Sequence, residues 1–350
     1  MTSHSQRNQI DLNQACTDRP TKGSVLSPER RRELFRVHPL IKGNVALPTP
    51  PVQELYRALI RVVLLRDAGC CITAPSGFGK SSALRLIRLQ FSKDFPDLPV
   101  YKHSAFNHRV ESVRSFFKHF LETAQNSNTS GETYDLRSRL SHTLVDNSQH
   151  SDLGLVLLLV DEAQEMLISD YGFLKDVYNA LAEEDVRLIV VLMGESPRFG
   201  TQITQLVSAG RADLVNRFTE RKFSLRPLRA VNDMRAILRE IDLATFPQRP
   251  ALKWTEFFFP TAFQSGFRLE NECERFTDAL ARIARPRNKD VGYPAKQVFS
   301  AIRALVTDNA AYDSHDMKLP KLAWDEAVKW AKMEDALHLA NAAADLAVKI

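Results

Sequence analysis

The sequence lacks three features that would each point to a particular class of protein. No apolar run approaches the ~20 residues that a transmembrane helix needs, since the longest spans 153–160. The N-terminus has no apolar segment of the kind found in signal peptides. The four cysteines, Cys16, Cys70, Cys71 and Cys273, form no C-x-x-C pair, which favours buried free thiols over zinc sites and disulfides. These absences predict a soluble cytoplasmic protein with no membrane partner.

The length and net charge of the chain restrict its domain number and its class of binding partner only slightly. The 350 residues, 44% of them hydrophobic, suffice for about two domains with buried cores. Lys and Arg outnumber Asp and Glu by 47 to 42, which gives a net charge of +5 and an isoelectric point near 9.0. A basic chain favours a polyanionic partner. Charge alone does not distinguish DNA from RNA or a membrane surface.

A glycine loop lies between an apolar strand pattern at 69–73 and a helical pattern at 83–89. It matches the phosphate-binding pattern G-x-x-x-x-G-K-[ST], except that Ala74 replaces the first glycine. In this pattern backbone N–H groups surround the phosphates, the lysine binds β- and γ-phosphate oxygens, and the hydroxyl ligates Mg²⁺. The loop therefore predicts ATP and Mg²⁺ as cofactors. The predicted nucleotide-binding residues are Pro75, Ser76, Gly77, Phe78, Gly79, Lys80, Ser81 and Ser82.

A second motif follows the apolar run at 153–160, where the sequence reads Asp161-Glu162-Ala163-Gln164. Such a run is typical of a strand that is buried on both faces of a parallel sheet. At the carboxyl end of this strand, Asp161 is predicted to hold Mg²⁺ together with Ser81. Glu162 is predicted to accept a proton from the attacking water. A carboxylate pair in this position suits hydrolysis rather than phosphoryl transfer to another substrate, from which water must be kept out.

Two further segments carry candidate catalytic residues. The strand predicted over 187–196 ends in Glu195-Ser196, and in P-loop ATPases with an additional strand a polar residue there lies near the γ-phosphate and the lytic water. Ser196 is predicted to hold that position, with Glu195 as the alternative.

Arg217, at the tip of the predicted helix 212–218, is expected to reach the γ-phosphate of a neighbouring subunit and stabilise transition-state charge. The alternative for Arg217 is an ordinary surface arginine.

Strand and helix patterns alternate along the chain, which predicts an α/β fold with a parallel sheet flanked by helices. Residues 1–47 are polar and basic and precede a Pro-rich stretch, so they are predicted to form a basic N-terminal arm. Helices are predicted over 52–65, 136–144 and 171–181, strands over 69–73, 98–101, 153–160, 187–196 and 221–225, and a loop over 102–109.

Together these motifs resemble those of AAA+ ATPases, and more narrowly those of the transposition regulators of the TnsC, TniB and MuB type. The narrower resemblance covers about 48–306 and rests on motif spacing, on the Asp161-Glu162-Ala163-Gln164 box and on the Gly194-Glu195-Ser196 strand end. It implies an AAA+ core over 48–230 and a small α-helical lid over 231–308. Residues 309–350 are then a helical tail that either extends the lid or binds a partner.

The resemblance also implies a second cationic sensor in the lid. Lys296 is the candidate, although Gly292-Tyr293-Pro294-Ala295-Lys296 departs from the usual Gly-x-x-Arg spacing. The alternative is a solvated lysine on the helix surface.

The family's subunits assemble with ATP around duplex DNA, which implies a homo-oligomer in the form of a ring or helical filament. The loop and helix after the second strand would contact DNA without reading its sequence. Arg114 and Lys118 are one helical turn apart and share a face, so they could follow phosphates; the alternative is a solvated basic helix face. The predicted DNA-contacting residues are Lys102, His103, His108, Arg109, Arg114 and Lys118.

The sequence therefore predicts an ATPase that assembles on double-stranded target DNA and recruits or activates a transposase. A target-selection protein and a bacterial, nucleoid-associated location follow from the same resemblance. One alternative is an ATPase of the initiator or helicase-loader type. The other is a nucleotide-switched signalling scaffold that does not bind DNA.

Overall fold

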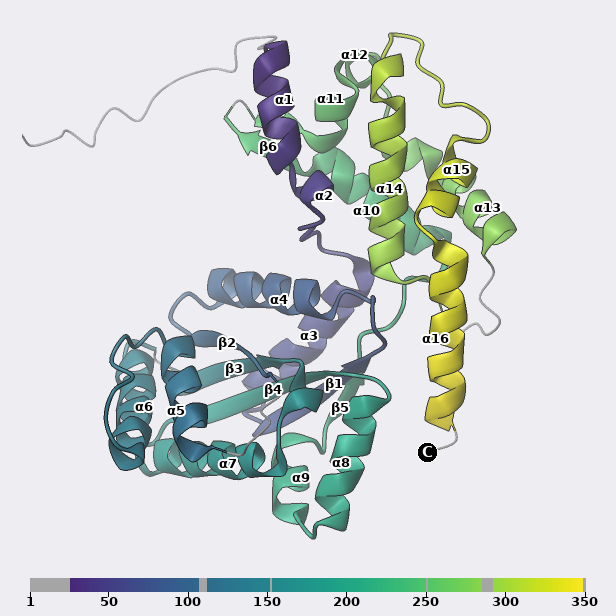
Figure 1. Cartoon of the computed structure of the whole chain (residues 1–350). Coiled ribbons are helices and arrows are strands. Elements are labelled where there is room, and N and C mark those ends of the chain that lie inside the picture. The colour runs from purple at the N-terminus through teal and green to yellow at the C-terminus, as the bar shows by residue number, and fades with distance from the viewer. Residues whose placement is uncertain (1–25, 107–111, 152, 250, 285–291, 349–350) are drawn as a thin grey trace, which may run out of the picture.

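A five-stranded parallel sheet organises one of the two lobes visible in Figure 1. The computed structural model describes residues 26–106, 112–151, 153–249, 251–284 and 292–348. The strand order is β2-β3-β4-β1-β5, with every neighbouring pair parallel. The strands are β1 (Gly69–Ala74), β2 (Val100–Ser104), β3 (Leu155–Asp161), β4 (Arg187–Glu195) and β5 (Lys222–Ser224).

Helices cover both faces of this sheet, and β3 shows why. All of its residues are buried. Successive side chains point to opposite faces of a strand, and those of β3 divide between two apolar clusters, Leu157 in one and Leu158 in the other. Each fully buried leucine contributes roughly 1.5–3 kcal/mol to folding. The predicted α/β fold with a flanked parallel sheet is confirmed.

The sheet lobe contains most of the elements that the sequence predicts. Its helices are α3 (Pro50–Leu64), α4 (Lys80–Asp94), α5 (Val113–Thr123), α6 (Thr133–Ser148), α7 (Ile168–Glu183), α8 (Arg198–Ser208) and α9 (Ala212–Phe218), with a 3₁₀ turn η1 (Ala163–Glu165). The helices predicted over 52–65, 136–144 and 171–181 correspond to α3, α6 and α7. The loop predicted from 102 instead begins after Ser104, because Lys102, His103 and Ser104 continue β2 alongside β3.

The second lobe is mainly helical. It contains α10 (Ala230–Leu243), α11 (Trp254–Phe258), α12 (Pro260–Gln264), α13 (Cys273–Ile283), α14 (Ala295–Asn309), α15 (Ala323–Trp330) and α16 (Met333–Val348), with 3₁₀ turns η2 (Leu269–Glu272) and η3 (Ala310–Tyr312). A short antiparallel pair, β6 (Thr245–Gln248) and β7 (Ala251–Lys253), was not predicted. A bridge between Leu228 and Tyr293 links the segment that follows β5 to the segment before α14.

The described part of the predicted N-terminal arm packs on the helical lobe. It forms α1 (Pro28–Val37) and α2 (Pro39–Lys42), which lie beside α11 in Figure 1. His38, between the two helices, is fully buried, and burial lowers its pKa to about 4. Four aromatic rings lie within about 5 Å of its ring, those of Phe246, Trp254, Phe257 and Phe258.

The two tryptophans of the C-terminal helices have different surroundings. Trp324 is 1% exposed and stacks on Phe276 with ring centroids 4.2 Å apart, whereas Trp330 is 76% exposed.

Cys70, Cys71 and Cys273 are free buried thiols, as predicted, and Cys16 lies outside the described residues. In the part of the chain that the structure describes, no helix has the length and apolar character needed to cross a membrane.

Candidate functional site

The glycine loop connects β1 to α4, and two of its glycines have backbone conformations that other residues rarely adopt. Gly77 has φ +79° and Gly79 has φ +88°, values that glycine tolerates because it has no Cβ. Gly79 is also the N-cap of α4, so the loop brings its N–H groups and a helix N-terminus to one point.

Ala74, where the motif has its first glycine, is the last residue of β1 and is 2% exposed. It pairs with Glu195 across the sheet and is not among the residues with positive φ. An extended strand residue needs no glycine, which explains the departure from the motif.

Lys80, the first residue of α4, is only 6% exposed. Its Nζ donates to the carbonyl oxygens of Ala74, at 3.4 Å, and Pro75, at 3.2 Å. Burial lowers the pKa of Lys80, and nearby carboxylates, chiefly that of Glu195, act in the opposite direction. The loop thus holds an ammonium group close to the N–H groups that would surround a phosphate.

A cavity of about 630 Å³ extends over the glycine loop and is lined by residues of both lobes. Its volume is within the range of small-molecule binding sites. All the predicted nucleotide-binding residues except Pro75 line it. One wall comes from the N-terminal segment, which sequence analysis missed because no motif marks it. The apolar residues of this wall are Leu40, Val45, Leu47 and Val52.

Asp161, the predicted magnesium ligand, ends β3 and is 2% exposed. Its Oδ2 lies 3.0 Å from Lys102 Nζ, and its Oδ1 accepts the backbone N–H of Glu162 at 3.1 Å. Asp161 thus forms an ion pair with a lysine of its own subunit, and it is not among the described residues that line the cavity. Ser81 lines the cavity, and hydroxyl and carboxylate oxygens are ligands that Mg²⁺ prefers. The ligand types of Ser81 and Asp161 are therefore those of a magnesium site, and the assignment of these two residues as ligands stays a prediction.

Strand β4 ends beside the glycine loop, and it brings Glu195 rather than Ser196 to the cavity. Glu195 and Glu162 both line the cavity, whereas Ser196 donates its backbone N–H to the carbonyl of Ala74 at 3.0 Å. Glu195 is the last residue of β4, whereas Ser196 lies in the turn that follows the strand. Of the two candidates Glu195 lines the cavity, and the catalytic role of either residue stays a prediction.

The helical lobe contributes two cations to the cavity. The backbone N–H of Lys296, in the first turn of α14, donates to the carbonyl of Gly77 at 3.0 Å. Arg303, seven residues later, lies on the same face of the helix and also lines the cavity. Arg303 was not predicted from the sequence, because it lies well beyond the segment 292–296 in which the sensor was expected. Trp330, from the C-terminal helices, completes this side.

Arg217 and the glycine loop lie at opposite ends of strand β1. The backbone carbonyl of Arg217 is next to Gly69, the first residue of β1, since a Cβ atom at Gly69 would be 3.4 Å from this oxygen. The glycine loop follows the last residue of β1. Six strand residues span about 20 Å. The guanidinium group lies over the Tyr178 ring, 4.4 Å from its centroid, and donates to Asn179 Oδ1 at 2.7 Å. Arg217 therefore does not contact its own subunit's glycine loop.

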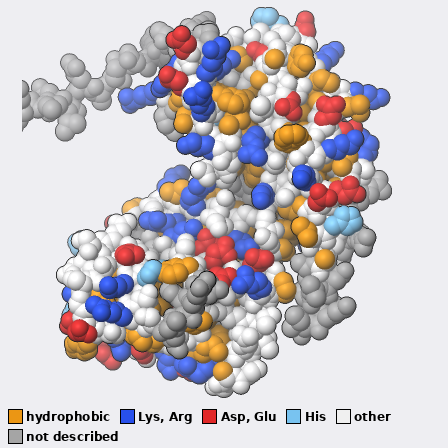
Figure 2. Space-filling view, viewed as in Figure 1, with side chains coloured by type: hydrophobic (Ala, Val, Ile, Leu, Met, Phe, Trp, Pro, Cys, Tyr) orange, Lys and Arg blue, Asp and Glu red, His pale blue; other side chains and the backbone are white. Residues whose placement is uncertain are grey.

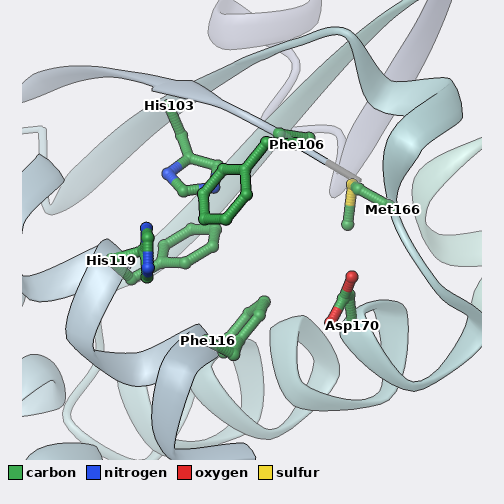
Figure 3. A pocket seen from close by; sticks show the side chains of 8 residues that line it. His103, Phe106, Phe116, His119, Met166 and Asp170 are labelled. Atoms are coloured by element: carbon green, nitrogen blue, oxygen red, sulfur yellow. The ribbon is translucent and has the colours of Figure 1, made fainter. Parts of the chain in front are cut away.

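Two of the residues predicted to contact DNA face inward. Lys102 is directed to the carboxylate of Asp161. His103 is 9% exposed, stacks on Phe120 with centroids 4.1 Å apart, and has its Nδ1 2.9 Å from Thr123 Oγ1. Figure 3 shows His103 among the side chains that line a small pocket. Because β2 is longer than predicted, His103 lies in the strand and packs against α5 rather than standing in a surface loop.

Two other predicted DNA contacts, Arg114 and Lys118, lie on α5. Arg114 is exposed and donates from Nη2 to the carbonyl of Gly131 at 2.9 Å. Lys118, one turn later, is half-buried. His108 and Arg109 lie outside the described residues.

Comparison with known proteins supports the class of fold. A family model described as "AAA domain" matches residues 65–200, which include the glycine loop, β3 and β4. No curated protein matches the chain.

The chain is similar in structure to several solved proteins. Orc1 of Aeropyrum pernix in complex with DNA is 13% identical, with a TM-score of 0.47, and the match covers 86% of this chain and 69% of that one. The Drosophila origin recognition complex bound to DNA is 14% identical, with a TM-score of 0.44 and coverage of 93% and 70%. Domain III of DnaA from Thermotoga maritima is 13% identical, with a TM-score of 0.41 and coverage of 85% and 98%. Similarities at this level carry no inference about function.

The strand order, the glycine loop, the buried strand-end aspartate and the matched AAA domain define a P-loop NTPase fold of the AAA+ type with an attached helical region. The fold and the matched domain therefore support assignment of the protein as a nucleotide-binding ATPase.

Proposed function

We propose that the protein is a Mg²⁺-dependent AAA+ ATPase that oligomerises on double-stranded DNA and regulates DNA transposition by recruiting or activating a transposase. Lys80 and Ser81 would hold the phosphates and, with Asp161, a magnesium ion. The ion would neutralise charge on the β- and γ-phosphates. Glu162 would take a proton from the attacking water, and ATP would favour the assembled state that hydrolysis dissolves.

The position of Arg217 is the observation that supports a shared site most directly. It lies across the sheet from its own glycine loop, and Tyr178 and Asn179 hold its guanidinium group on the surface of α7. An arginine placed there would complete a neighbouring subunit's site rather than its own. A site divided in this way would couple ATP binding to assembly, because both subunits contact the same γ-phosphate.

Replacement of Arg217 by alanine should leave ATP binding to the isolated subunit within twofold of wild type. Hydrolysis by the assembled protein should fall about 10³-fold, the lower end of the effect of an arginine supplied in trans. The measurements are nucleotide titration and ATPase rate against protein concentration. Arg211→Ala is the matched control, because Arg211 flanks the other end of α9 and pairs with Asp213. Unchanged hydrolysis by Arg217→Ala would remove this residue from the site.

DNA would bind to basic residues, none of which is among those that line the nucleotide cavity. Arg114 and Lys118 share a face of α5, and the exposed arginines Arg32 and Arg36 lie on α1. Figure 2 shows Lys and Arg side chains gathered over α1 and beside the hollow between the lobes. Such cations would bind phosphates without reading sequence.

Binding to random-sequence duplex DNA should require ATP and weaken linearly with the logarithm of salt concentration. The double variant Arg114→Ala, Lys118→Ala should lower the magnitude of that slope by about two, one for each lost phosphate contact. Arg137→Ala, on the neighbouring helix α6 and paired with Asp176, is the control that should leave the slope unchanged. Fluorescence anisotropy at several salt concentrations provides both quantities.

The DNA-binding assay and a pull-down together distinguish the proposed function from the two alternative functions. Absence of any ATP-dependent DNA binding would favour a nucleotide-switched scaffold. DNA binding without capture of a transposase of the DDE type, in a pull-down with the ATP-bound protein, would favour an ATPase of the initiator or helicase-loader type. Capture of the transposase together with DNA binding supports the proposal.

A further inference from the structure

Gln164 joins the proposed general base to the end of a neighbouring strand. Its Nε2 donates to Glu162 Oε2 at 2.5 Å, and its Oε1 accepts the backbone N–H of Glu195 at 2.8 Å. Glu162 and Glu195 both line the nucleotide cavity. One amide therefore spans the gap between the carboxylate that would activate water and the strand end that faces the phosphates.

The chemistry of the partners fixes the orientation of this amide. A backbone N–H can only donate, so the Gln164 oxygen must face Glu195. An ionised carboxylate can only accept, so the Gln164 nitrogen must face Glu162. Reversing the amide would break both hydrogen bonds, and the chain of donors and acceptors therefore has a single direction. Each bond in such a chain polarises the next and strengthens it.

The surrounding turn is anchored independently of the amide. Gln164 lies in the 3₁₀ turn η1, whose first residue, Ala163, is fully buried. Glu165 pairs with Arg198 of α8 at 2.8 Å, and Gln202 donates to the carbonyl of Met166 just after the turn. The residues that flank Gln164 in the chain are thus held by burial, by an ion pair and by a hydrogen bond, and none of these contacts involves the Gln164 amide.

Glu162 itself has an uncommon conformation, with φ +56°. A left-handed conformation at a residue other than glycine costs of order 1–3 kcal/mol and persists only where the surroundings enforce it. The amide of Gln164 engages Oε2, and among the described residues no hydrogen bond to Oε1 is formed. One carboxylate oxygen is therefore held while the other remains available to a water molecule.

We propose that Gln164 is a positioning residue for ATP hydrolysis, holding the Glu162 carboxylate at a fixed angle and tying it to the end of β4. This inference rests on the proposed ATPase function. Gln164 would not touch the nucleotide and would act only through Glu162. Loss of its two hydrogen bonds should therefore lower kcat and leave nucleotide affinity unchanged.

Two substitutions separate the two hydrogen bonds in the full-length protein. Gln164→Met keeps the approximate shape of the side chain and removes both bonds. Gln164→Glu keeps the acceptor for the N–H of Glu195 and replaces the donor to Glu162 with a second carboxylate. Both should lower kcat for ATP by about 10- to 100-fold, the effect expected when a reacting group is misplaced by about 1 Å. KM, the Kd for a fluorescent ATP analogue and the thermal unfolding midpoint should change little.

The background variant Glu162→Gln tests whether Gln164 acts through Glu162. In that background Gln164→Met should have no additional effect on kcat, which a merely structural role would not explain. Gln205→Ala, an exposed glutamine of α8, is the control that should match wild type. Wild-type kcat in both Gln164 variants overturns the inference and leaves the ATPase function intact. A wild-type protein that fails to hydrolyse ATP overturns both.

Discussion

Replacement of Lys80 by alanine should abolish detectable ATP binding and, with it, ATP-dependent assembly on DNA. The ammonium group is buried in the glycine loop and donates to two carbonyls there. Glu195, Glu162 and Asp161 lie close enough to influence its pKa. Without Lys80, a nucleoside triphosphate would approach Glu195 and Glu162 with no ammonium group from the glycine loop to offset their charge.

The expected loss can be bounded from the cost of leaving buried charge unpaired. Removing one member of a buried charge pair costs about 3–5 kcal/mol, which corresponds to roughly 10²- to 10⁴-fold in affinity. Titration with a fluorescent ATP analogue measures the affinity, and light scattering in the presence of DNA measures assembly. Lys93→Ala removes an exposed lysine near the other end of α4 and should leave both unchanged. Tight ATP binding by Lys80→Ala would mean that the loop does not hold the phosphates.

The sheet lobe could be predicted from sequence because its signals are local. The apolar run at 153–160 and the strand pattern at 187–196 are continuous, since strands buried on both faces need apolar side chains at every position. The glycine loop is equally local, because its left-handed residues require glycine whatever the rest of the fold does. These local patterns are enough to predict the order of the elements along the chain from β1 to β5.

The parts that sequence reasoning missed depend on contacts between distant segments. Residues 102–104 are polar and look like a loop, and they become strand only because β3 supplies hydrogen-bonding partners more than fifty residues later. His38 is buried by aromatic residues of β6 and α11, which no local pattern connects to the N-terminus. Lys102 was predicted to face DNA for the same reason: its charge is visible in the sequence, whereas its direction toward Asp161 is not.

In the candidate site, too, some residues could be predicted from local sequence and others are brought together only by the fold. The residues that bind phosphate follow one another along the chain and form a recognisable motif. The residues that would position Glu162 come from η1 and the end of β4. Gln164 belongs to the Asp161-Glu162-Ala163-Gln164 box, but the sequence does not show that its side chain contacts Glu162 and the N–H of Glu195. An amide three residues after an aspartate is unremarkable until the turn folds it back between two strands.

Replacement of Glu162 by glutamine should separate assembly from turnover. The variant keeps the size of the side chain and removes the group that would accept a proton from water, and loss of such a base costs about 10²- to 10⁴-fold in rate. ATP binding should be preserved, because Lys80, Ser81 and Asp161 are unchanged. The DNA-bound assembly should therefore form with ATP and persist, since hydrolysis is the step that would dissolve it.

Steady-state ATPase rate and the lifetime of the DNA complex after dilution measure the two effects. Glu183→Gln is the matched control, because this exposed carboxylate is the last residue of α7 and does not line the cavity. Normal turnover in Glu162→Gln would exclude Glu162 as the base. A slow enzyme whose DNA complex still dissociated at the wild-type rate would instead show that nucleotide exchange, rather than hydrolysis, ends the assembled state.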